Sequence, residues 1–248
     1  SGYSNGYDEK NMNVKLDIEI IQEAIDSSPW FKDTPKQGRN QLACAANIKT
    51  YSKKSYVFQN GDSNTDIYCV ISGRLRLGAT SSTGQEFTFT DYNQGSWFGE
   101  ETLSVEDPRL FGVLVLEESI VLVIPRKIVL SVSEKFPAMY RNIFIDHTLK
   151  ARGLYRLLEG ILFSPLSARL AGRLLEQAKL YGVQTDQGIR LDISLSQSDF
   201  ANLVMGSRPR VNKIFGQWRD NNIVVMEQGK YLIKNLAALE DELELIDE

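Results

Sequence analysis

LSQSDFANLVMGSRPRVNKIFGQWRD, residues 195–220, is the stretch that decides the fold of the second half of the chain. Ser196 and Asp199 stand three residues apart ahead of an apolar run, which is the spacing of a capping box at a helix start. Met205-Gly206 interrupts that run, and Ser207 then offers the N-cap of a second helix. Two short helices joined by a glycine-containing turn predict a helix-turn-helix.

The second predicted helix has an inward and an outward face. Its apolar side chains recur at helical spacing and predict the inward face: Val211, Ile214, Phe215 and Trp218. No acidic residue occurs between Phe200 and Arg219, so the outward face is basic. Arginine, lysine and amide side chains near the start of such a helix reach base edges in a major groove. We expect outward contacts to DNA from Arg208, Arg210, Asn212, Lys213 and Gln217, with Ser196, Gln197 and Lys230 holding phosphates.

Residues 223–235, IVVMEQGKYLIKN, are typical of a hairpin that turns at Gln228-Gly229-Lys230. A hairpin directly after a helix-turn-helix predicts a winged helix. Pro209 is compatible with this assignment, because proline is tolerated in the first turn of a helix. One alternative stays open: the basic face is the solvated surface of a structural winged helix that contacts protein.

Residues 138–163 predict a long helix that follows Pro137. Its apolar residues form two adjacent stripes, more than one flank of a small domain needs, so the helix is expected to pair with a second copy of the chain. Packing only within the chain is the alternative. One stripe contains Tyr140, Ile143, His147, Leu154, Leu157 and Ile161, and the other Phe144, Ala151, Tyr155, Leu158 and Leu162. The expected dimer seam consists of Ile143, His147, Leu154, Leu158 and Ile161.

Residues 48 to about 124 alternate short β-branched and aromatic runs with turn residues. RLRLGA (74–79) and EFTFTD (86–91) show the period-2 alternation of half-buried strands. Strands of this length and spacing predict an antiparallel β-roll of the double-stranded β-helix or jelly-roll type. Residues 15–47 add one or two short helices. The fold class is therefore α+β: an N-terminal roll, a long dimerisation helix and a C-terminal winged helix-turn-helix.

Composition excludes several classes of site. The 248 residues contain one histidine, His147, and two cysteines, Cys44 and Cys69, so a four-cysteine zinc or iron–sulfur site and a multi-histidine metal site cannot form within one chain. An enzyme built on a metal-binding roll is excluded with them, and we expect no catalytic residues. We expect both cysteines to be buried thiols. The net charge is −4, and no apolar run approaches a bilayer's thickness, so we expect a cytoplasmic protein without membrane contact.

Three stretches carry a resemblance to a known family: FQNGDSNTDIYCVISGRLRL (58–77), YNQGSWFGE (92–100) and LSQSDFANLVMGSRPRVNKIF (195–215). With the order of roll, long helix and winged helix, the chain resembles the bacterial Crp/Fnr transcription regulators over about residues 40–235. The resemblance implies DNA contacts from Arg208, Pro209, Arg210 and Lys213. A position that is typically acidic in the family holds Pro209, which has no side-chain donor or acceptor, so the operator sequence stays open.

The resemblance also implies an effector pocket in GEETLSVEDPRLFG, residues 99–112. In cyclic-nucleotide-binding members, the Gly-Glu turn holds the sugar and an arginine followed by Ser or Thr clamps the phosphate. Gly99, Glu100 and Arg109 match that pattern, whereas Leu110 does not. The polar pair that meets the purine corresponds to Leu154 and Tyr155. Three interpretations stay open: Arg109 pairs with Glu100 or Glu101, the pocket takes another small ligand, or it binds a cyclic nucleotide. We expect that cAMP is not the signal. The sequence identifies no cofactor, and a small-molecule effector stays open.

These assignments divide the chain into five segments. Ser164 as N-cap with Pro165 at the first helical position predicts the hinge before the DNA-binding domain. The expected partners are double-stranded DNA with a pseudo-palindromic operator, a second copy of the chain, and RNA polymerase. The segments are a flexible N-terminus (1–14), an effector domain (15–136), the dimerisation helix (137–163), the winged helix-turn-helix (164–236) and an acidic tail (237–248).

Overall fold

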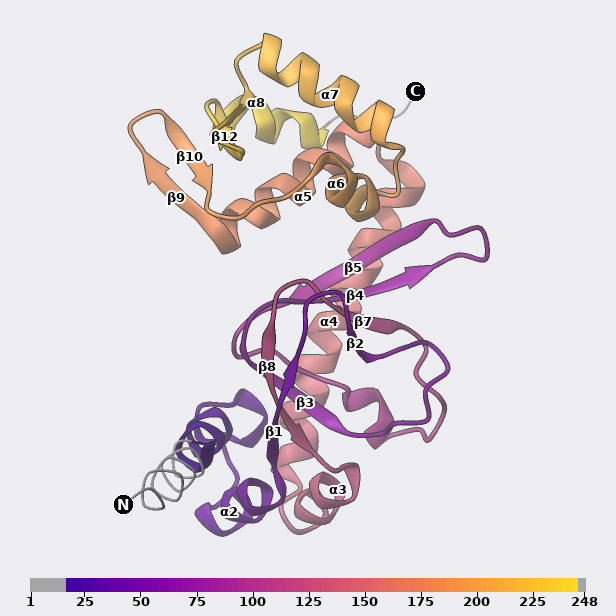
Figure 1. Ribbon diagram of the computed structural model, residues 1–248, viewed down its shortest axis with the longest axis vertical. Helices are drawn as coiled ribbons and strands as arrows, with labels where there is room; N and C mark the ends of the chain where they lie inside the picture. Colours follow the sequence, from indigo (N-terminus) through magenta and orange to yellow (C-terminus); the bar gives the residue numbers. More distant parts are fainter. Residues whose placement is uncertain (1–16, 245–248) are drawn as a thin grey trace, which may run out of the picture. The chain divides into compact units, whose positions relative to one another are not determined.

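The computed structural model describes residues 17–244 (Figure 1). The expected flexible segment 1–14 and the last four residues of the acidic tail lie outside the described residues. The chain forms two compact units. The first unit comprises the described residues up to Ala79 together with Phe89–Ala151, and the second comprises Thr80–Thr88 and residues 152–244.

Two four-stranded antiparallel sheets form the roll of the first unit. One sheet has the order β1-β8-β3-β6 and the other the order β2-β7-β4-β5. This is the antiparallel roll that the alternating sequence predicts. The strands are β1 (Asn47–Tyr51), β2 (Tyr56–Phe58), β3 (Ile67–Ser72), β4 (Leu75–Thr80), β5 (Glu86–Tyr92), β6 (Trp97–Phe98), β7 (Gly112–Val115) and β8 (Ser119–Ile124).

Helices cover part of the roll and share a core with it. Trp30, Phe31 and Trp97 meet in that core, with ring centroids of Phe31 and Trp97 5.0 Å apart. A second core lies within the roll, where the Phe98 ring stacks on Tyr92 at 4.6 Å. The helical elements are residues 17–26, η1 (Pro29–Phe31), α2 (Lys36–Ala45), η2 (Glu100–Leu103), α3 (Arg126–Lys135) and α4 (Ala138–Phe163), whose residues from 152 onward belong to the second unit.

The second unit is a winged helix around one apolar core that includes Leu170, Phe200, Phe215 and Trp218. Its sheet has the order β11-β12-β10-β9. Residues 80–88, the tip of the β4–β5 hairpin, also group with this unit. The elements are α5 (Leu166–Tyr181), β9 (Gly182–Thr185), β10 (Gly188–Leu191), α6 (Gln197–Val204), α7 (Arg208–Asp220), β11 (Val224–Glu227), β12 (Lys230–Ile233), α8 (Leu236–Asp241) and η3 (Glu242–Glu244).

Three local details differ from the sequence-based expectations. Pro165 occupies the N-cap position of α5, so Ser164 is not the cap. The β9–β10 hairpin was not predicted, because its runs GVQT and GIRL contain too few apolar residues to show a strand period. Cys44 is exposed, whereas Cys69 is buried as expected. Cys44 lies on α2, whose inward face is occupied by Gly38 and Leu42.

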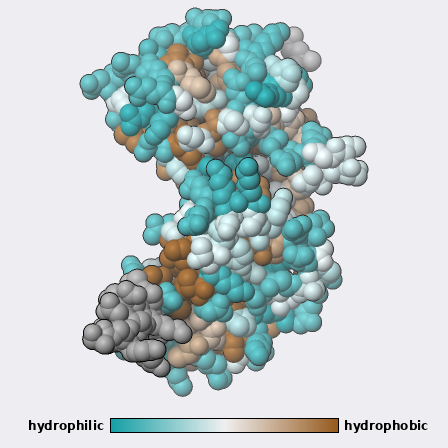
Figure 2. Space-filling model, viewed as in Figure 1, coloured by the Kyte–Doolittle hydropathy of each residue, from teal (hydrophilic) through white to brown (hydrophobic). Residues whose placement is uncertain are grey.

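Hydrophobic residues on the face seen in Figure 2 gather in a few patches on an otherwise largely hydrophilic surface. Between residues 17 and 244, no helix combines the length and the apolar character needed to cross a bilayer.

Candidate functional site

The capping box that opens α6 forms as predicted. Ser196 Oγ accepts a hydrogen bond from the Asp199 backbone N–H at 3.0 Å, and Asp199 Oδ2 accepts from the Ser196 N–H at 2.7 Å. Ser196 Oγ also donates to Asp199 Oδ2 at 2.8 Å. These reciprocal bonds satisfy donors that a helix N-terminus leaves free. The Ser196 hydroxyl, which we expected to hold a phosphate, is therefore already engaged.

The turn between α6 and α7 needs a small residue at Gly206. A Cβ placed there would lie 2.8 Å from Leu166 Cδ1, closer than real Cβ atoms approach a neighbour. Met205, one residue earlier, adopts the left-handed conformation with φ at 55°. Gly206 thus allows close packing against α5, while Met205 makes the reversal that sequence reasoning assigned to the pair.

The α7 helix has the inward and outward faces that its spacing predicts. Val211, Phe215 and Trp218 are buried in the unit's core, with the Phe215 and Trp218 rings packed edge-on at 5.6 Å. Ser207 is the N-cap residue, but its side chain makes no capping hydrogen bond. The outward residues are exposed, as a nucleic-acid contact requires: Arg208, Pro209, Arg210, Asn212, Lys213 and Gln217.

The predicted wing is the β11–β12 hairpin, and it turns through Gln228 and Gly229 with φ of 51° and 76°. Two successive left-handed residues are typical of a tight hairpin turn. Lys230, expected to hold a phosphate, donates its ammonium hydrogen bond to Asp192 Oδ1. That hydrogen bond and the charge of Lys230 lower the pKa of Asp192. The wing lysine is therefore partly neutralised by its own chain.

Arg109 is buried, with its side chain wholly shielded from solvent. Its Nη1 donates to Glu101 Oε1 at 2.6 Å and to the Gly99 carbonyl at 3.3 Å. Its Nη2 donates to the Asp66 carbonyl at 2.6 Å. The guanidinium carbon also lies 4.2 Å from the ring centroid of Phe58, within range of a cation–π contact. The pairing that the sequence left open between Glu100 and Glu101 is thus made with Glu101.

Gly99 sets the direction of this loop. Its φ of 93° belongs to the left-handed region, and an added Cβ would lie 2.9 Å from the Asp66 carbonyl oxygen. Only glycine combines that backbone with so close an approach. The chain then enters η2, which sends the side chains of Glu100 and Glu101 in different directions.

Glu100 is buried beside the middle of α4 and has two basic neighbours. Its Oε1 accepts from Lys150 Nζ at 3.0 Å and lies 3.3 Å from His147 Nδ1. Burial opposes ionisation of Glu100, but the hydrogen bond with His147 and the charge of Lys150 outweigh it and lower its pKa. The same hydrogen bond raises the pKa of His147, against a smaller opposing effect of burial.

Lys150 completes this cluster and was missed from the sequence. It forms an ion pair with Asp146 at 2.8 Å and donates to the Trp97 carbonyl at 2.8 Å. Asp146 in turn accepts from Trp30 Nε1 at 3.0 Å. The i,i+4 spacing of Asp146 and Lys150 was an available signal. It does not reveal Glu100, which is 50 residues away in the sequence.

The other expected effector residues are exposed. Leu110 is 67% exposed, and its carbonyl accepts from Asn60 Nδ2 at 2.6 Å. Leu154 and Tyr155 lie on α4 in the second unit and are 40% and 69% exposed. The first unit therefore brings Gly99, Glu100 and Arg109 together, and Leu110 adds no side-chain donor to them.

The residues expected at the dimer seam differ in how far their side chains are exposed and free to contact a second copy of the chain. Ile143 is buried in the first unit's own core, so its side chain is occupied within the chain. His147 is half-exposed and bonded to Glu100, Leu154 and Leu158 are exposed, and Ile161 is partly buried. The adjacent stripe is more accessible than the one containing Ile143. Large exposed apolar side chains on α4 are Tyr140, Phe144, Ile145, Leu149, Leu154, Tyr155, Leu158, Leu162 and Phe163.

Among the described residues, His, Cys, Asp and Glu side chains form no group of three or more suited to a metal ion. What the structure presents instead is a winged helix-turn-helix with a basic outward face, carried on the same chain as an antiparallel roll. That combination defines a DNA-binding transcription regulator of the roll-and-winged-helix class.

Comparison with known proteins specifies the class further. The model of the cyclic nucleotide-binding domain matches residues 48–136, and that of the Crp-like helix-turn-helix domain matches residues 168–242. The chain belongs to the Crp/Fnr family of transcription regulators.

Relatives and solved structures agree with this assignment. The anaerobic regulatory protein of Bacillus subtilis is 26% identical over 77% of this chain and 82% of its own length. The CRP-like cAMP-activated global transcriptional regulator of Mycobacterium tuberculosis is 25% identical over 74% of this chain and 82% of its own. A CooA mutant from Carboxydothermus hydrogenoformans superposes with a TM-score of 0.69 at 22% identity, covering 80% of this chain and 88% of that one. The c-di-GMP responsive global regulator CLP of Xanthomonas campestris superposes with a TM-score of 0.71 at 18% identity, covering 80% of this chain and 99% of that one.

Proposed function

We propose that this protein is a homodimeric, sequence-specific DNA-binding transcription regulator whose roll responds to a signal other than cAMP. The observation that carries the DNA-binding part is the exposed basic face of α7. Arg208, Arg210 and Lys213 stand on a helix whose opposite face is fixed in the core. Arginine and lysine donate to guanine O6 and N7, and Asn212 has the carboxamide that pairs with adenine.

Pro209 limits what the first turn of α7 reads. Its side chain neither donates nor accepts a hydrogen bond. Base recognition therefore falls to its neighbours on the same exposed face, and the operator differs from those of relatives with an acidic residue at this position.

The dimer is supported by the exposed apolar face of α4. Leu158 and Leu162 are 53% and 62% exposed, and Phe144 and Tyr155 are each 69% exposed. A helix that leaves so many large apolar side chains in water is expected to bury them against a partner. Two copies related by a two-fold axis would read a pseudo-palindrome with half-sites about one helical turn apart. RNA polymerase is the partner through which such a regulator acts on transcription.

A signal other than cAMP is supported by the partners of Arg109. The guanidinium is engaged by Glu101 and by the Asp66 carbonyl, so an incoming phosphate would have to displace a carboxylate of the chain. Leu110 supplies no side-chain donor for that phosphate. The relatives named above respond, by their names, to different signals, cAMP in one and c-di-GMP in another.

Selection of bound fragments from genomic DNA tests the proposal. The purified protein should retain a set of fragments that share a two-fold symmetric sequence, with affinity that falls as salt rises. Retention of no shared sequence, together with binding to a protein partner through α7, would support the alternative that the winged helix contacts protein.

A further inference from the structure

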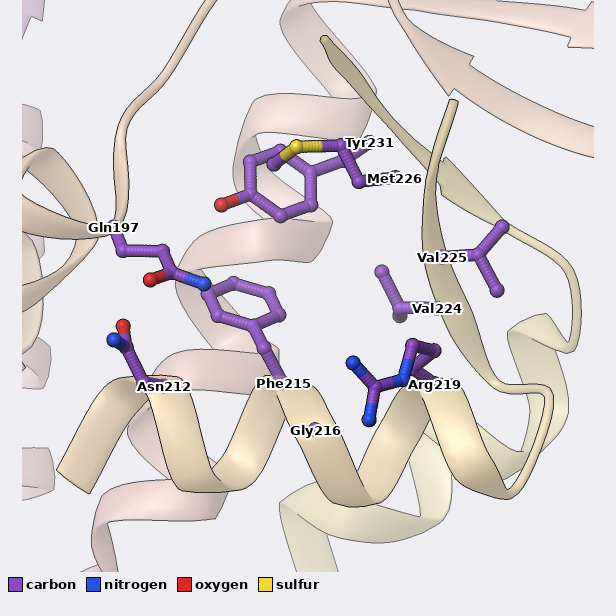
Figure 3. A pocket seen from close by; sticks show the side chains of 9 residues that line it. All are labelled: Gln197, Asn212, Phe215, Gly216, Arg219, Val224, Val225, Met226 and Tyr231. Carbon is purple, nitrogen blue, oxygen red and sulfur yellow. The ribbon is translucent and has the colours of Figure 1, made fainter. Parts of the chain in front are cut away.

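A pocket of about 150 Å³ lies between α7 and the β11–β12 hairpin (Figure 3). The α7 helix contributes Asn212, Phe215 and Arg219 to its lining, the hairpin contributes Met226 and Tyr231, and the start of α6 contributes Gln197. All of these residues belong to the second unit. A cavity of about 150 Å³ accepts a molecule the size of benzene. A phosphate group therefore fits in this pocket.

Tyr231 leaves a buried hydroxyl without a partner in this pocket. The residue is 2% exposed, and its hydroxyl oxygen has no hydrogen-bond partner among the described residues. The ring cannot easily turn away, because it stacks on Phe215 at 4.8 Å and packs edge-on against Phe200 at 5.2 Å. Burial raises the pKa of Tyr231 to about 12, so the group remains a protonated donor at neutral pH.

An unsatisfied buried hydroxyl costs stability, and such groups are uncommon enough in native structures to require an explanation. Figure 3 shows the hydroxyl on the side of the pocket where the side chains of Gln197 and Asn212 face each other. Both carboxamides can donate hydrogen bonds, and Arg219 adds a positive charge at the other end of the lining. No carboxylate lines the pocket. Asp220 is the exposed ion-pair partner of Arg219, at 2.9 Å.

The position of the pocket indicates where an anion would come from. Asn212 and Lys213 are consecutive on α7, so the pocket borders the face that we propose enters the major groove. A helix in that groove has the sugar–phosphate backbones along its flanks, and phosphates receive most hydrogen bonds in protein–DNA complexes. A hairpin beside the helix would approach one of those backbones.

We propose that this pocket is a subsite for one backbone phosphate of bound DNA, with the Tyr231 hydroxyl and the Gln197 carboxamide as its donors. The inference rests on the proposed DNA binding and adds a specific site to it. A phosphate oxygen supplies an acceptor that no described residue offers to the hydroxyl. The contact carries no base information, so it strengthens binding and sets the register of α7 in the groove.

Tyr231→Phe is the direct test, because it removes one oxygen atom and leaves both ring contacts in place. The thermal unfolding midpoint should stay the same or rise, since the hydroxyl loses no hydrogen bond to any described residue. Affinity for the selected operator should fall roughly tenfold to a hundredfold, the size of one hydrogen bond to a charged acceptor. The slope of log affinity against log salt should not change, because a neutral hydroxyl releases no counterion.

Operator duplexes in which each phosphate is replaced in turn by a neutral methylphosphonate identify the contact. The parent should lose affinity at one phosphate in each half-site, and Tyr231→Phe should lose much less at that same position. Gln197→Leu should show the same coupling, which keeps the test valid if Tyr231→Phe folds poorly. Equal operator affinity for parent and Tyr231→Phe would overturn the subsite, and so would a loss coupled to no phosphate. A parent that binds no DNA at all would instead overturn the proposed function, and this subsite with it.

Discussion

Arg109 Nη1 lies 2.6 Å from Glu101 Oε1, so the guanidinium that the family resemblance assigns to a ligand phosphate is held by a carboxylate of the same chain. The two residues differ in environment: the Arg109 side chain is fully buried, whereas that of Glu101 is 45% exposed. Glu101 can therefore return to water at modest cost, while Arg109 depends on its partners. The pairing joins the η2 turn to the loop before β7.

Replacing Arg109 by Met should destabilise the protein by roughly 2–4 kcal/mol. The substitution retains an apolar stem but leaves the Asp66 and Gly99 carbonyls without their donor, and a buried carbonyl without a partner costs about 1–3 kcal/mol. Chemical unfolding in urea measures the loss. Arg39→Met is the matched control, because Arg39 makes a partly exposed pair with Asp26 whose loss should cost about 1 kcal/mol or less. Equal effects of the two substitutions would show that Arg109 is not a structural residue.

Calorimetric titration with cAMP should show no micromolar binding by the parent protein. The physical reason is that Leu110 offers no side-chain donor and Arg109 is already paired. Glu101→Gln combined with Leu110→Ser should bind cAMP more tightly than the parent, because one change removes the carboxylate charge that competes for the guanidinium and the other adds a hydroxyl donor. Leu110→Ser alone is the control and should gain less. Tight cAMP binding by the parent that also raises operator affinity would contradict the assignment.

The pair of Glu100 and His147 should make stability depend on pH. The pKa of His147 is raised, so its contribution is fully present below its unfolded value of about 6.5 and is lost as pH rises through the folded value. The pKa of Glu100 is lowered, so its contribution is present above its unfolded value of about 4.3 and is lost as pH falls through the folded value. The pair therefore contributes most between about pH 4.3 and 6.5.

His147→Gln should remove the part of this contribution that comes from protonated His147 and is present at low pH. The difference in urea midpoint between parent and variant should be larger at pH 5.5 than at pH 8. Lys150 and Glu101 also act on His147 electrostatically, and both are retained in the variant. A difference that does not change with pH would mean that the hydrogen bond to Glu100 does not depend on the charge of His147.

Simultaneous replacement of Arg208, Arg210 and Lys213 by Ala should abolish selective binding to the operator. Loss of a base-reading side chain costs roughly 1–3 kcal/mol at the cognate site, and loss of a phosphate contact flattens the salt dependence. Gel-shift titration at several salt concentrations separates the two effects. Three exposed lysines of the first unit, Lys53, Lys54 and Lys127, provide a control with the same change in charge. If both triple variants bind the operator equally well, α7 is not the reading helix.

Leu158→Asp and Leu154→Asp should each convert the dimer to monomers and prevent operator binding. A carboxylate buried at the α4 seam would lack a partner, which is strongly unfavourable. Leu149→Asp is the matched control: Leu149 is also exposed, but nine residues along a helix of about 3.6 residues per turn place it on the side opposite Leu158. Light scattering measures the mass. Dimers that persist in both seam variants would show that the dimer interface lies elsewhere on the protein.

The sequence by itself determined the features that depend on local spacing. The capping box of Ser196 and Asp199, the two faces of α7, the hairpin at Gln228-Gly229 and the extent of α4 all follow from short-range patterns. The alternating strands likewise predicted an antiparallel roll. Each of these features is set by residues within a few positions of one another, where the side-chain period and the turn chemistry leave few alternatives.

Only the tertiary structure decided which side chains have partners. Glu101 and not Glu100 pairs with Arg109 because Gly99 turns the chain into η2, whereas Glu100 meets Lys150, 50 residues later. Ile143 belongs to the seam stripe by its spacing, yet it is buried in its own core because the first unit packs on that side of α4. The unpartnered Tyr231 hydroxyl is visible only once α6, α7 and the wing enclose it. These outcomes depend on long-range packing, which no local period in the sequence records.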